Sequence, residues 1–178
     1  MLEPWQNTRP PRVWQRECLP IAIAAAMTGA ATIVSAVTGA GKSTLIAELV
    51  SQALPHTQAR GHRIVISTPT QSLVAQLSQT IADRIGWANV GQYYGSRKQP
   101  ERTVIVTCTP SVASLGTALA KLGPRMRVSL LIADEAHKTE GDAIKSAIKA
   151  LRPAARIGFS ATPYRADEDG TVYPISTR

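Results

Sequence analysis

Short, uninterrupted apolar runs recur along this chain of 178 residues, and stretches with a helical pattern lie between them. The runs predict strands at residues 32–37, 63–68, 103–108, 128–134 and 156–161. The other stretches predict helices at residues 15–27, 42–53, 71–85, 111–121 and 141–151. Because the runs do not alternate apolar with polar residues, they are typical of a parallel sheet buried on both faces. We therefore expect an α/β fold with helices on both faces of the sheet and right-handed crossovers.

The length suits one domain with a proper core, which we assign to residues 1–165. Residues 86–102 form the longest irregular segment, and the polar residues 166–178 are expected to be a loosely held tail or the start of an interdomain linker. The apolar run 19–37 contains polar interruptions and leads into a glycine loop. We interpret it as a buried helix, a turn at Thr28–Gly29 and a buried strand, and we reject a signal peptide and a membrane span.

The charge balance is basic, with 20 Lys and Arg against 12 Asp and Glu and a formal net charge of +8. This indicates either a solvated basic surface or a polyanionic partner, most often nucleic acid. Five basic residues are spread over the loops, and most of them are interpreted as solvated surface: Arg97, Lys98, Arg102, Arg125 and Arg127. Tyr93 and Tyr94 are interpreted as core or turn residues rather than stacking platforms. The cysteines Cys18 and Cys108 lack metal-ligand spacing, so we expect a reduced intracellular chain, cytoplasmic or nucleoid-associated.

Polar clusters follow the predicted strands at residues 38–44, 68–71, 109–111, 134–137 and 160–162. The carboxyl ends of parallel strands meet at one edge of the sheet, and ligands of open α/β sheets bind there. We therefore expect these clusters to form one functional edge.

The segment 36-AVTGAGKST-44 is close to the phosphate-binding pattern G-x-x-x-x-G-K-[ST], with Ala36 in place of the first glycine. Gly39 and Gly41 permit close approach of main-chain N–H groups to phosphate, and the helix that follows adds its dipole. Lys42 is predicted to reach the β- and γ-phosphates, and Ser43 to place its hydroxyl on Mg²⁺. The predicted binding residues for ATP are Thr38, Gly39, Ala40, Gly41, Lys42, Ser43 and Thr44.

The segment 134-DEAH-137 ends the fourth apolar run. A carboxylate at the end of a buried strand is what a phosphate-loop site needs to hold Mg²⁺, and we assign this role to Asp134. Glu135 is predicted to orient and deprotonate the attacking water. The other interpretation of these acidic residues is an exposed helix cap.

These segments, in their order along the chain, resemble the motifs of superfamily 2 helicases and translocases of the DEAH-containing group. The chain resembles the first, N-terminal RecA-like ATPase domain of these proteins. Within the group it is similar to DNA-translocating and restriction-type helicase subunits. Residues 38–43 resemble motif I, and many members also carry Ala at its first position. Residues 67–76 resemble motif Ia, 109–111 motif Ib, 134–137 motif II and 160–163 motif III. Upstream, 12-RVWQRECL-19 resembles the segment that reads adenine.

The resemblance implies roles for further residues at the nucleotide site. Gln15 would hydrogen-bond the adenine edge with Arg12 and Trp14 beside the base, although an ordinary polar helix start is the alternative. His137 would belong to the nucleotide-binding residues. Ser160, Ala161 and Thr162 would couple the nucleotide site to the nucleic acid.

The resemblance also implies a nucleic-acid face, in which motifs Ia and Ib contact the sugar–phosphate backbone. Its residues here would be Pro69, Thr70, Gln71, Thr109, Pro110 and Ser111. Helix capping by Thr70 and Ser111 is a compatible second role. DNA is favoured over RNA, because the R-x-W-Q segment and 158-GFSATPYR-165 look more like DNA translocases. No membrane partner is expected.

The family's catalytic unit also has a second RecA-like domain, which carries the arginines that stabilise the transferring phosphoryl group. No such motif occurs in this sequence, so we expect an incomplete motor that needs a second domain in cis or in trans. The isolated chain should then hydrolyse ATP slowly at best. A non-hydrolysing module that binds nucleotide and nucleic acid is the alternative function, and an unrelated phosphate-loop enzyme such as a small-molecule kinase is a third.

Overall fold

A computed structural model of the chain describes residues 11–37, 39–123, 126–134, 141–161, 164–166 and 172–174. Its helices are α1 (Val13–Thr28), α2 (Lys42–Ala59), α3 (Gln71–Ile85), α4 (Val112–Leu122) and α5 (Gly141–Leu151), with a 3₁₀ turn η1 (Thr109–Ser111) before α4. The strands of the main sheet are β1 (Ala31–Ser35), β2 (Arg63–Thr68), β3 (Val90–Tyr94), β4 (Arg97–Lys98), β5 (Val104–Cys108), β6 (Val128–Ala133) and β7 (Ala155–Ser160). A separate hairpin pairs β8 (Tyr164–Ala166) with β9 (Val172–Pro174).

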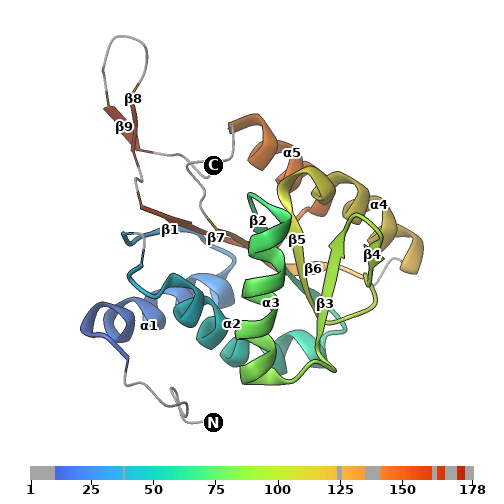
Figure 1. Cartoon of the computed structure of the whole chain (residues 1–178), viewed down its shortest axis with the longest axis horizontal. Coiled ribbons are helices and arrows are strands. Elements are labelled where there is room, and N and C mark those ends of the chain that lie inside the picture. Colours follow the sequence, from blue (N-terminus) through green and yellow to red (C-terminus); the bar gives the residue numbers. More distant parts are fainter. Residues whose placement is uncertain are drawn as a thin grey trace.

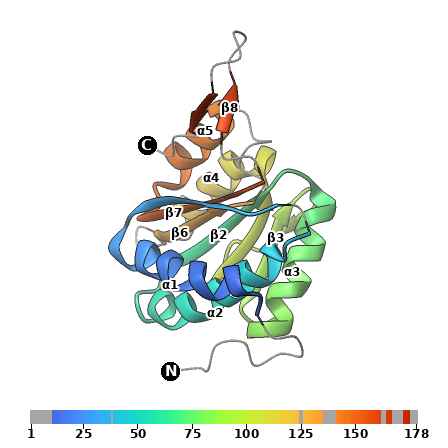
Figure 2. The same ribbon diagram turned by 90° about the vertical axis from the view of Figure 1, so that its left-hand side faces the viewer.

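The main sheet has seven strands in the order β1-β7-β6-β2-β5-β3-β4, and every pairing is parallel apart from β3 with β4. The chain first moves from β1 outward to β3 and then returns through β5, β6 and β7. Because crossovers are right-handed, this reversal places helices on opposite faces of the sheet. Figures 1 and 2 show α1, α2 and α3 on one face and α4 and α5 on the other.

The central strands β2, β5, β6 and β7 are buried on both faces, as their continuous apolar pattern predicts. The strand predicted to be buried at the start of the sheet, β1, is an edge strand in which Val34 alone is buried. In β2, Ile64 and Ile66 belong to the core cluster shared with α1, α2 and α3, whereas Val65 belongs to the cluster shared with α4 and α5. All three side chains are fully buried. The predicted α/β fold is confirmed, including the turn at Thr28–Gly29, where Gly29 ends α1 in the left-handed conformation.

The prediction that residues 86–102 are irregular is wrong, because they contain β3 and β4. β3 lacks a continuous apolar run, since Gly91 and Gln92 lie at its centre. A Cβ atom on Gly91 would lie 2.7 Å from the Gln99 carbonyl oxygen, so this glycine allows the returning chain to pack closely. The Gln99 side chain then accepts a hydrogen bond from the Gln92 N–H at 3.1 Å.

Two further boundaries differ from the prediction. α2 continues to Ala59 past Pro55, because Leu54 and Thr57 remain buried on the same helix beyond the position where a proline signal suggests an end. Within the polar segment 166–178, residues 172–174 form a strand that pairs with 164–166, which the sequence did not predict. In the part of the chain that the structure describes, no helix is both long enough and apolar enough to cross a bilayer.

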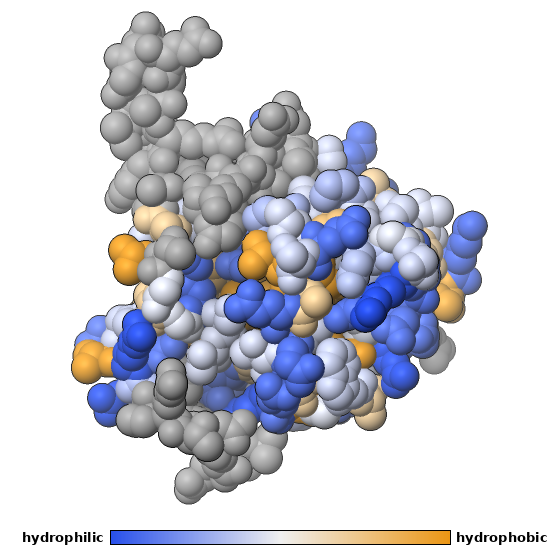
Figure 3. All heavy atoms as spheres, in the orientation of Figure 1, coloured by the Kyte–Doolittle hydropathy of each residue, from blue (hydrophilic) through white to orange (hydrophobic). Residues whose placement is uncertain are grey.

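The face of the molecule seen in Figure 3 is largely hydrophilic, and its hydrophobic side chains are scattered rather than gathered into one patch. The larger exposed apolar residues are Val13, Ile21, Met27, Val37, Trp87 and Leu122. Single exposed apolar side chains of this kind are ordinary on a protein surface.

Candidate nucleotide and nucleic-acid site

The parallel register brings the described polar clusters to one edge of the sheet. The glycine loop follows β1, Ser160 ends β7, Asp134 follows β6, Thr68–Gln71 follows β2 and η1 follows β5. These strands are neighbours in the order β1, β7, β6, β2 and β5. The predicted edge is therefore present. Four of the predicted site residues, Thr38, Glu135, His137 and Thr162, lie outside the residues that the structure describes.

The glycine loop has the backbone that its sequence predicts. Gly39 and Gly41 have φ angles of 78° and 93°, in the left-handed region where glycine is favoured. Apart from the two chain neighbours, no atom of the described residues lies within 4 Å of a Cβ atom built on Gly39, so they leave room for a ligand at this part of the loop. Gly41 is the N-cap of α2 and has no side-chain cap, and the main-chain N–H groups of the first helical turn need partners. This donor set suits phosphate oxygens.

Lys42 is buried at the start of α2, with 8% of its surface exposed. Its Nζ donates a hydrogen bond to the Ala36 carbonyl oxygen at 3.3 Å. Ala36 in turn donates its N–H to the Ser160 carbonyl at 2.9 Å, which ties the end of β1 to the end of β7. The absent first glycine thus leaves the loop geometry intact, because Ala36 contributes only its main chain to these contacts.

The start of α1 holds the glycine loop through three side-chain donors on three successive carbonyl oxygens. Arg12 Nη1 bonds to Gly39 at 3.2 Å, Trp14 Nε1 to Ala40 at 3.3 Å and Gln15 Nε2 to Gly41 at 2.9 Å. In a planar trans peptide the C=O and N–H groups point in opposite directions. Holding these carbonyls toward α1 therefore turns the following N–H groups, those of Ala40, Gly41 and Lys42, away from α1. The Ala40 N–H donates within the loop, to the Val37 carbonyl at 3.1 Å.

This contact is the part of the site that sequence reasoning missed. Gln15 is 4% exposed, and its Oε1 also accepts the Arg12 main-chain N–H at 2.8 Å. Each end of its amide thus makes one hydrogen bond within the protein, and each has the capacity for one more. A spacing of 26 residues between Gln15 and Gly41 gives no sign of this contact in the sequence.

Asp134 lies directly after β6 and is half-buried. Its main-chain N–H donates to the Ser67 carbonyl at 2.9 Å, which fixes the start of the acidic segment against β2. One strand, β7, separates β6 from β1, so the two strand ends lie about 10 Å apart. Ser160 is fully buried on that intervening strand. Ser43 and Asp134 both carry oxygen atoms of the kind that bind Mg²⁺.

The far half of the edge carries a row of hydroxyl groups. Thr109 Oγ1 donates to the Thr68 carbonyl at 3.1 Å, and Thr68 Oγ1 donates to the Thr70 carbonyl at 3.0 Å. Thr70 and Ser111 are the N-cap residues of α3 and α4, yet neither makes a side-chain cap hydrogen bond. The predicted capping role is therefore not realised. At the start of α4 the Val112 N–H donates instead to the Thr109 carbonyl of η1.

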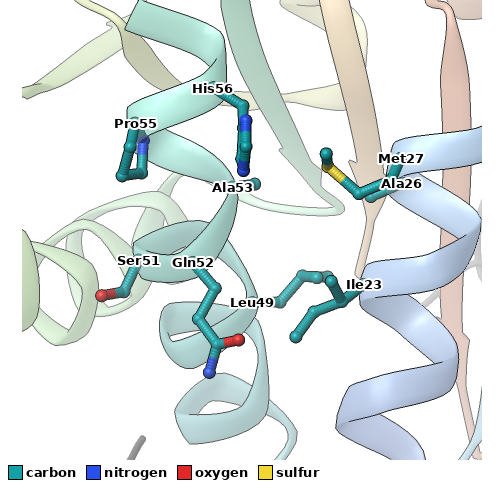
Figure 4. A pocket seen from close by; sticks show the side chains of 9 residues that line it. All are labelled: Ile23, Ala26, Met27, Leu49, Ser51, Gln52, Ala53, Pro55 and His56. Atoms are coloured by element: carbon teal, nitrogen blue, oxygen red, sulfur yellow. The ribbon is translucent and has the colours of Figure 1, made fainter. Parts of the chain in front are cut away.

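An open cavity of about 500 Å³ lies elsewhere, between α1 and α2 (Figure 4). Ile23 and Met27 of α1 face Leu49 of α2 across it, and Pro55 and His56 line its other end. None of the predicted site residues lines this cavity. It is a gap between two helices beside the sheet, and it is distinct from the polar edge.

A parallel sheet covered on both faces, with a glycine loop between β1 and α2, defines a RecA-like domain of the phosphate-loop class. The chain belongs to the DEAD/DEAH box helicase family, whose profile matches residues 15–169. No curated protein matches the chain.

Similar solved structures support the fold. The SWI2/SNF2 ATPase core of Sulfolobus solfataricus, in complex with dsDNA, has a TM-score of 0.72 and 18% identity over 91% of this chain and 34% of that one. The UvsW helicase of bacteriophage T4 has a TM-score of 0.65 and 19% identity over 89% and 55%. A hypothetical ATP-dependent RNA helicase of Sulfolobus tokodaii has a TM-score of 0.67 and 21% identity over 88% and 48%. This chain thus spans between about a third and about half of the length of these proteins.

Proposed function

We propose that the chain is the ATP-binding motor domain of a nucleic-acid-dependent ATPase that couples ATP hydrolysis to translocation on, or unwinding of, nucleic acid. The observation that carries the proposal is the glycine loop held open by α1, on the same sheet edge as Asp134 and the hydroxyl row of β2 and β5. Membership of the DEAD/DEAH box family supports it.

In this proposal each half of the edge has its own task. Lys42 contacts the β- and γ-phosphates, while Ser43 and Asp134 hold the Mg²⁺ that offsets the negative charge of the phosphates. Glu135 orients the attacking water and accepts its proton. We assign the coupling of the two halves to the segment Ser160–Thr162, as the family resemblance implies. Its strand β7 pairs with β1 and β6, so the segment adjoins the glycine loop and Asp134 of the nucleotide half.

The nucleic-acid half uses Pro69, Thr70, Gln71, Thr109, Pro110 and Ser111. Hydroxyl and first-turn N–H groups suit phosphate oxygens and carry little sequence information, so binding should depend on the backbone rather than on the base sequence. DNA is our preferred polymer. The dsDNA complex of the SWI2/SNF2 core supports this preference, although an RNA helicase is among the similar structures.

Efficient turnover requires a second RecA-like domain, because an arginine supplied across the cleft accelerates phosphoryl transfer by about 10³–10⁵ in related phosphate-loop enzymes. We propose that this domain acts in cis or in trans. The isolated chain then binds ATP with Mg²⁺ and hydrolyses it slowly.

The first test measures ATP binding and hydrolysis by the chain, with and without single-stranded and duplex DNA and RNA. Lys42→Ala should lower the affinity for ATP with Mg²⁺ at least about 100-fold, because several charge-assisted contacts to phosphate are lost, and should leave the circular dichroism spectrum unchanged. Unchanged affinity would remove the phosphate-loop assignment.

A second variant separates the motor from the non-hydrolysing module. Glu135→Gln should retain ATP binding and remove both residual turnover and the turnover restored by a second domain. If the unmodified chain never hydrolyses ATP with any polymer or added domain, the binding module is the correct function. Strong stimulation of the chain alone by one polymer would contradict the need for a second domain.

A further inference from the structure

The β3–β4 hairpin lies at the end of the functional edge and carries two exposed cations, Arg97 and Lys98. β3 is parallel to β5, so its carboxyl end at Tyr94 lies at the same edge as η1. The turn at Gly95 and Ser96 then returns the chain antiparallel, which places Arg97 opposite Tyr94 and Lys98 opposite Tyr93. Figure 1 shows β4 beside β3 at the outer border of the sheet.

Hydrogen bonds connect the hairpin to the predicted nucleic-acid residues. Thr107 Oγ1 donates to the Tyr93 carbonyl at 2.6 Å, and the Tyr93 hydroxyl donates to the Ser114 carbonyl in the first turn of α4 at 3.2 Å. Directly after β5, Thr109 of η1 donates a hydrogen bond from its hydroxyl to the Thr68 carbonyl at the end of β2. Hydrogen bonds therefore join the hairpin, η1 and the start of α3 into one continuous surface.

The two cations are held in place by neutral partners. Lys98 Nζ lies 4.1 Å from the centre of the Tyr93 ring, and the Arg97 guanidinium lies 6.0 Å from that of Tyr94. Arg97 also donates to the buried Gln92 side chain. Among the described residues, no carboxylate lies within ion-pair distance of either cation. Within the described part of the chain their charges are thus oriented and have no carboxylate beside them, which is unlike a solvated face where acids and bases are mixed.

We propose that Arg97 and Lys98 extend the nucleic-acid track, as contacts to the phosphodiester backbone of the bound strand. Adjacent strands lie about 4.8 Å apart, so the ends of β2, β5, β3 and β4 span about 14 Å. At about 3.4 Å per nucleotide, this distance corresponds to roughly four nucleotides of one strand. The proposal rests on the proposed function, since it adds a contact to that same surface, and it corrects the interpretation of these two residues as solvated surface only.

The test is the affinity of the chain for a fluorescently labelled single-stranded DNA of 20 thymidines, measured by anisotropy at several salt concentrations. The double variant Arg97→Ala/Lys98→Ala should bind about tenfold more weakly at low salt, and the slope of log K against log salt should fall by about 1.4, or about 0.7 for each phosphate contact. The matched control is Arg60→Ala/Lys121→Ala. It removes the same two charges from exposed positions at the helix ends of α2 and α4, away from the functional edge, and should stay within about twofold.

A charge-conserving variant, Arg97→Lys/Lys98→Arg, guards against a folding defect of the hairpin and should bind as the unmodified chain does. Equal losses in the alanine pair and the control pair would overturn the proposal, because they would report net charge alone. Unchanged binding in the alanine pair, together with weakened binding by Thr70→Ala/Thr109→Ala, would overturn the hairpin contact and retain the proposed function. No DNA or RNA binding by the unmodified chain at low salt would contradict both.

Discussion

Two buried cations at opposite edges of the sheet have different partners. Arg63 opens β2 at the amino edge, and Lys42 opens α2 at the carboxyl edge, and each is 8% exposed. The Arg63 guanidinium donates to the carbonyls of Gly61, His62 and Glu101, at 3.1, 3.0 and 3.1 Å. Lys42 donates to a carbonyl of the glycine loop that it serves.

The two edges of one sheet thus place a structural cation and a ligand-facing cation apart. A guanidinium is a rigid group with several donors. Here it links the start of β2 to the segment before β5 through the Glu101 carbonyl. Burial lowers the pKa of Arg63, and the nearby Glu101 opposes this change. A lysine is a flexible point charge, which suits an edge where a phosphate group arrives and leaves. We therefore expect substitutions at the amino edge to change stability, and those at the carboxyl edge to change binding.

The largest effect on stability is expected at a third buried charge, Glu48 of α2. It pairs with Arg84 of α3 at 2.7 Å, with side chains 3% and 13% exposed. Glu48→Ala should lower the free energy of unfolding by about 3–5 kcal/mol, because the buried ion pair between α2 and α3 is broken by removing one of its members. Urea unfolding measures the change.

The double variant Glu48→Ala/Arg84→Met is the control for this prediction. It should recover much of the lost stability, since no unpaired charge remains in the interface of the two helices. A double variant as unstable as the sum of its single variants would show that packing, and not the ion pair, holds α2 to α3.

The comparison itself is tested by Arg63→Met beside Lys42→Met. Arg63→Met should lower the free energy of unfolding by about 2 kcal/mol, because three carbonyls lose their donor and only part of the loss is replaced by water. Its affinity for ATP should stay the same. Lys42→Met should show the reverse pattern, with a loss of ATP affinity and little change in the urea midpoint. Similar stability losses in the two variants would contradict the assignment of stability to the amino edge and of binding to the carboxyl edge.

A smaller effect is expected within the glycine loop, where Gly41→Ala is compared with Gly39→Ala. Both residues have positive φ, so backbone strain alone should make each substitution cost about 1 kcal/mol of stability. A Cβ atom on Gly41 would also lie 2.9 Å from Gln15 Nε2, so Gly41→Ala should cost roughly 1–2 kcal/mol. Thermal unfolding in a Gln15→Ala background should abolish the difference between the two variants. A difference that persists there would show that the α1 contact is not its cause.

The smallest effect is a pH dependence at the amino edge. Burial lowers the pKa of His62 below 6.5, and Arg60 and Arg127 lower it further. The unfolded chain therefore binds the proton more readily than the folded one, so the contribution of His62 is fully present above the unfolded value. It is lost as the pH falls from about 6.5 through the folded pKa. The urea midpoint should fall slightly across this window, and His62→Gln should flatten that part of the profile. An unchanged slope in the variant would contradict the assignment.

Periodicity in the sequence was sufficient for most of the elements. The strand at residues 63–68 and the helices at 71–85 and 141–151 have the predicted bounds. These segments carry strong apolar patterns because one side of each helix and both sides of the strand are buried, so the pattern is a direct record of burial. The sequence did not predict β3, because Gly91 and the buried Gln92 interrupt its apolar pattern although the strand is buried.

The sequence by itself determined the α/β class, the glycine loop and the family resemblance, because these depend on residues that are close together in the chain. The tertiary structure decided which distant residues meet. It brought the side chains of Arg12, Trp14 and Gln15 within hydrogen-bond distance of the glycine loop. It placed β7 between β1, which leads into the loop, and β6, which leads to Asp134. It also brought the hairpin cations to the edge of β2 and β5. Such contacts arise from strand order and helix packing, and no local periodicity encodes the partner of a buried polar group.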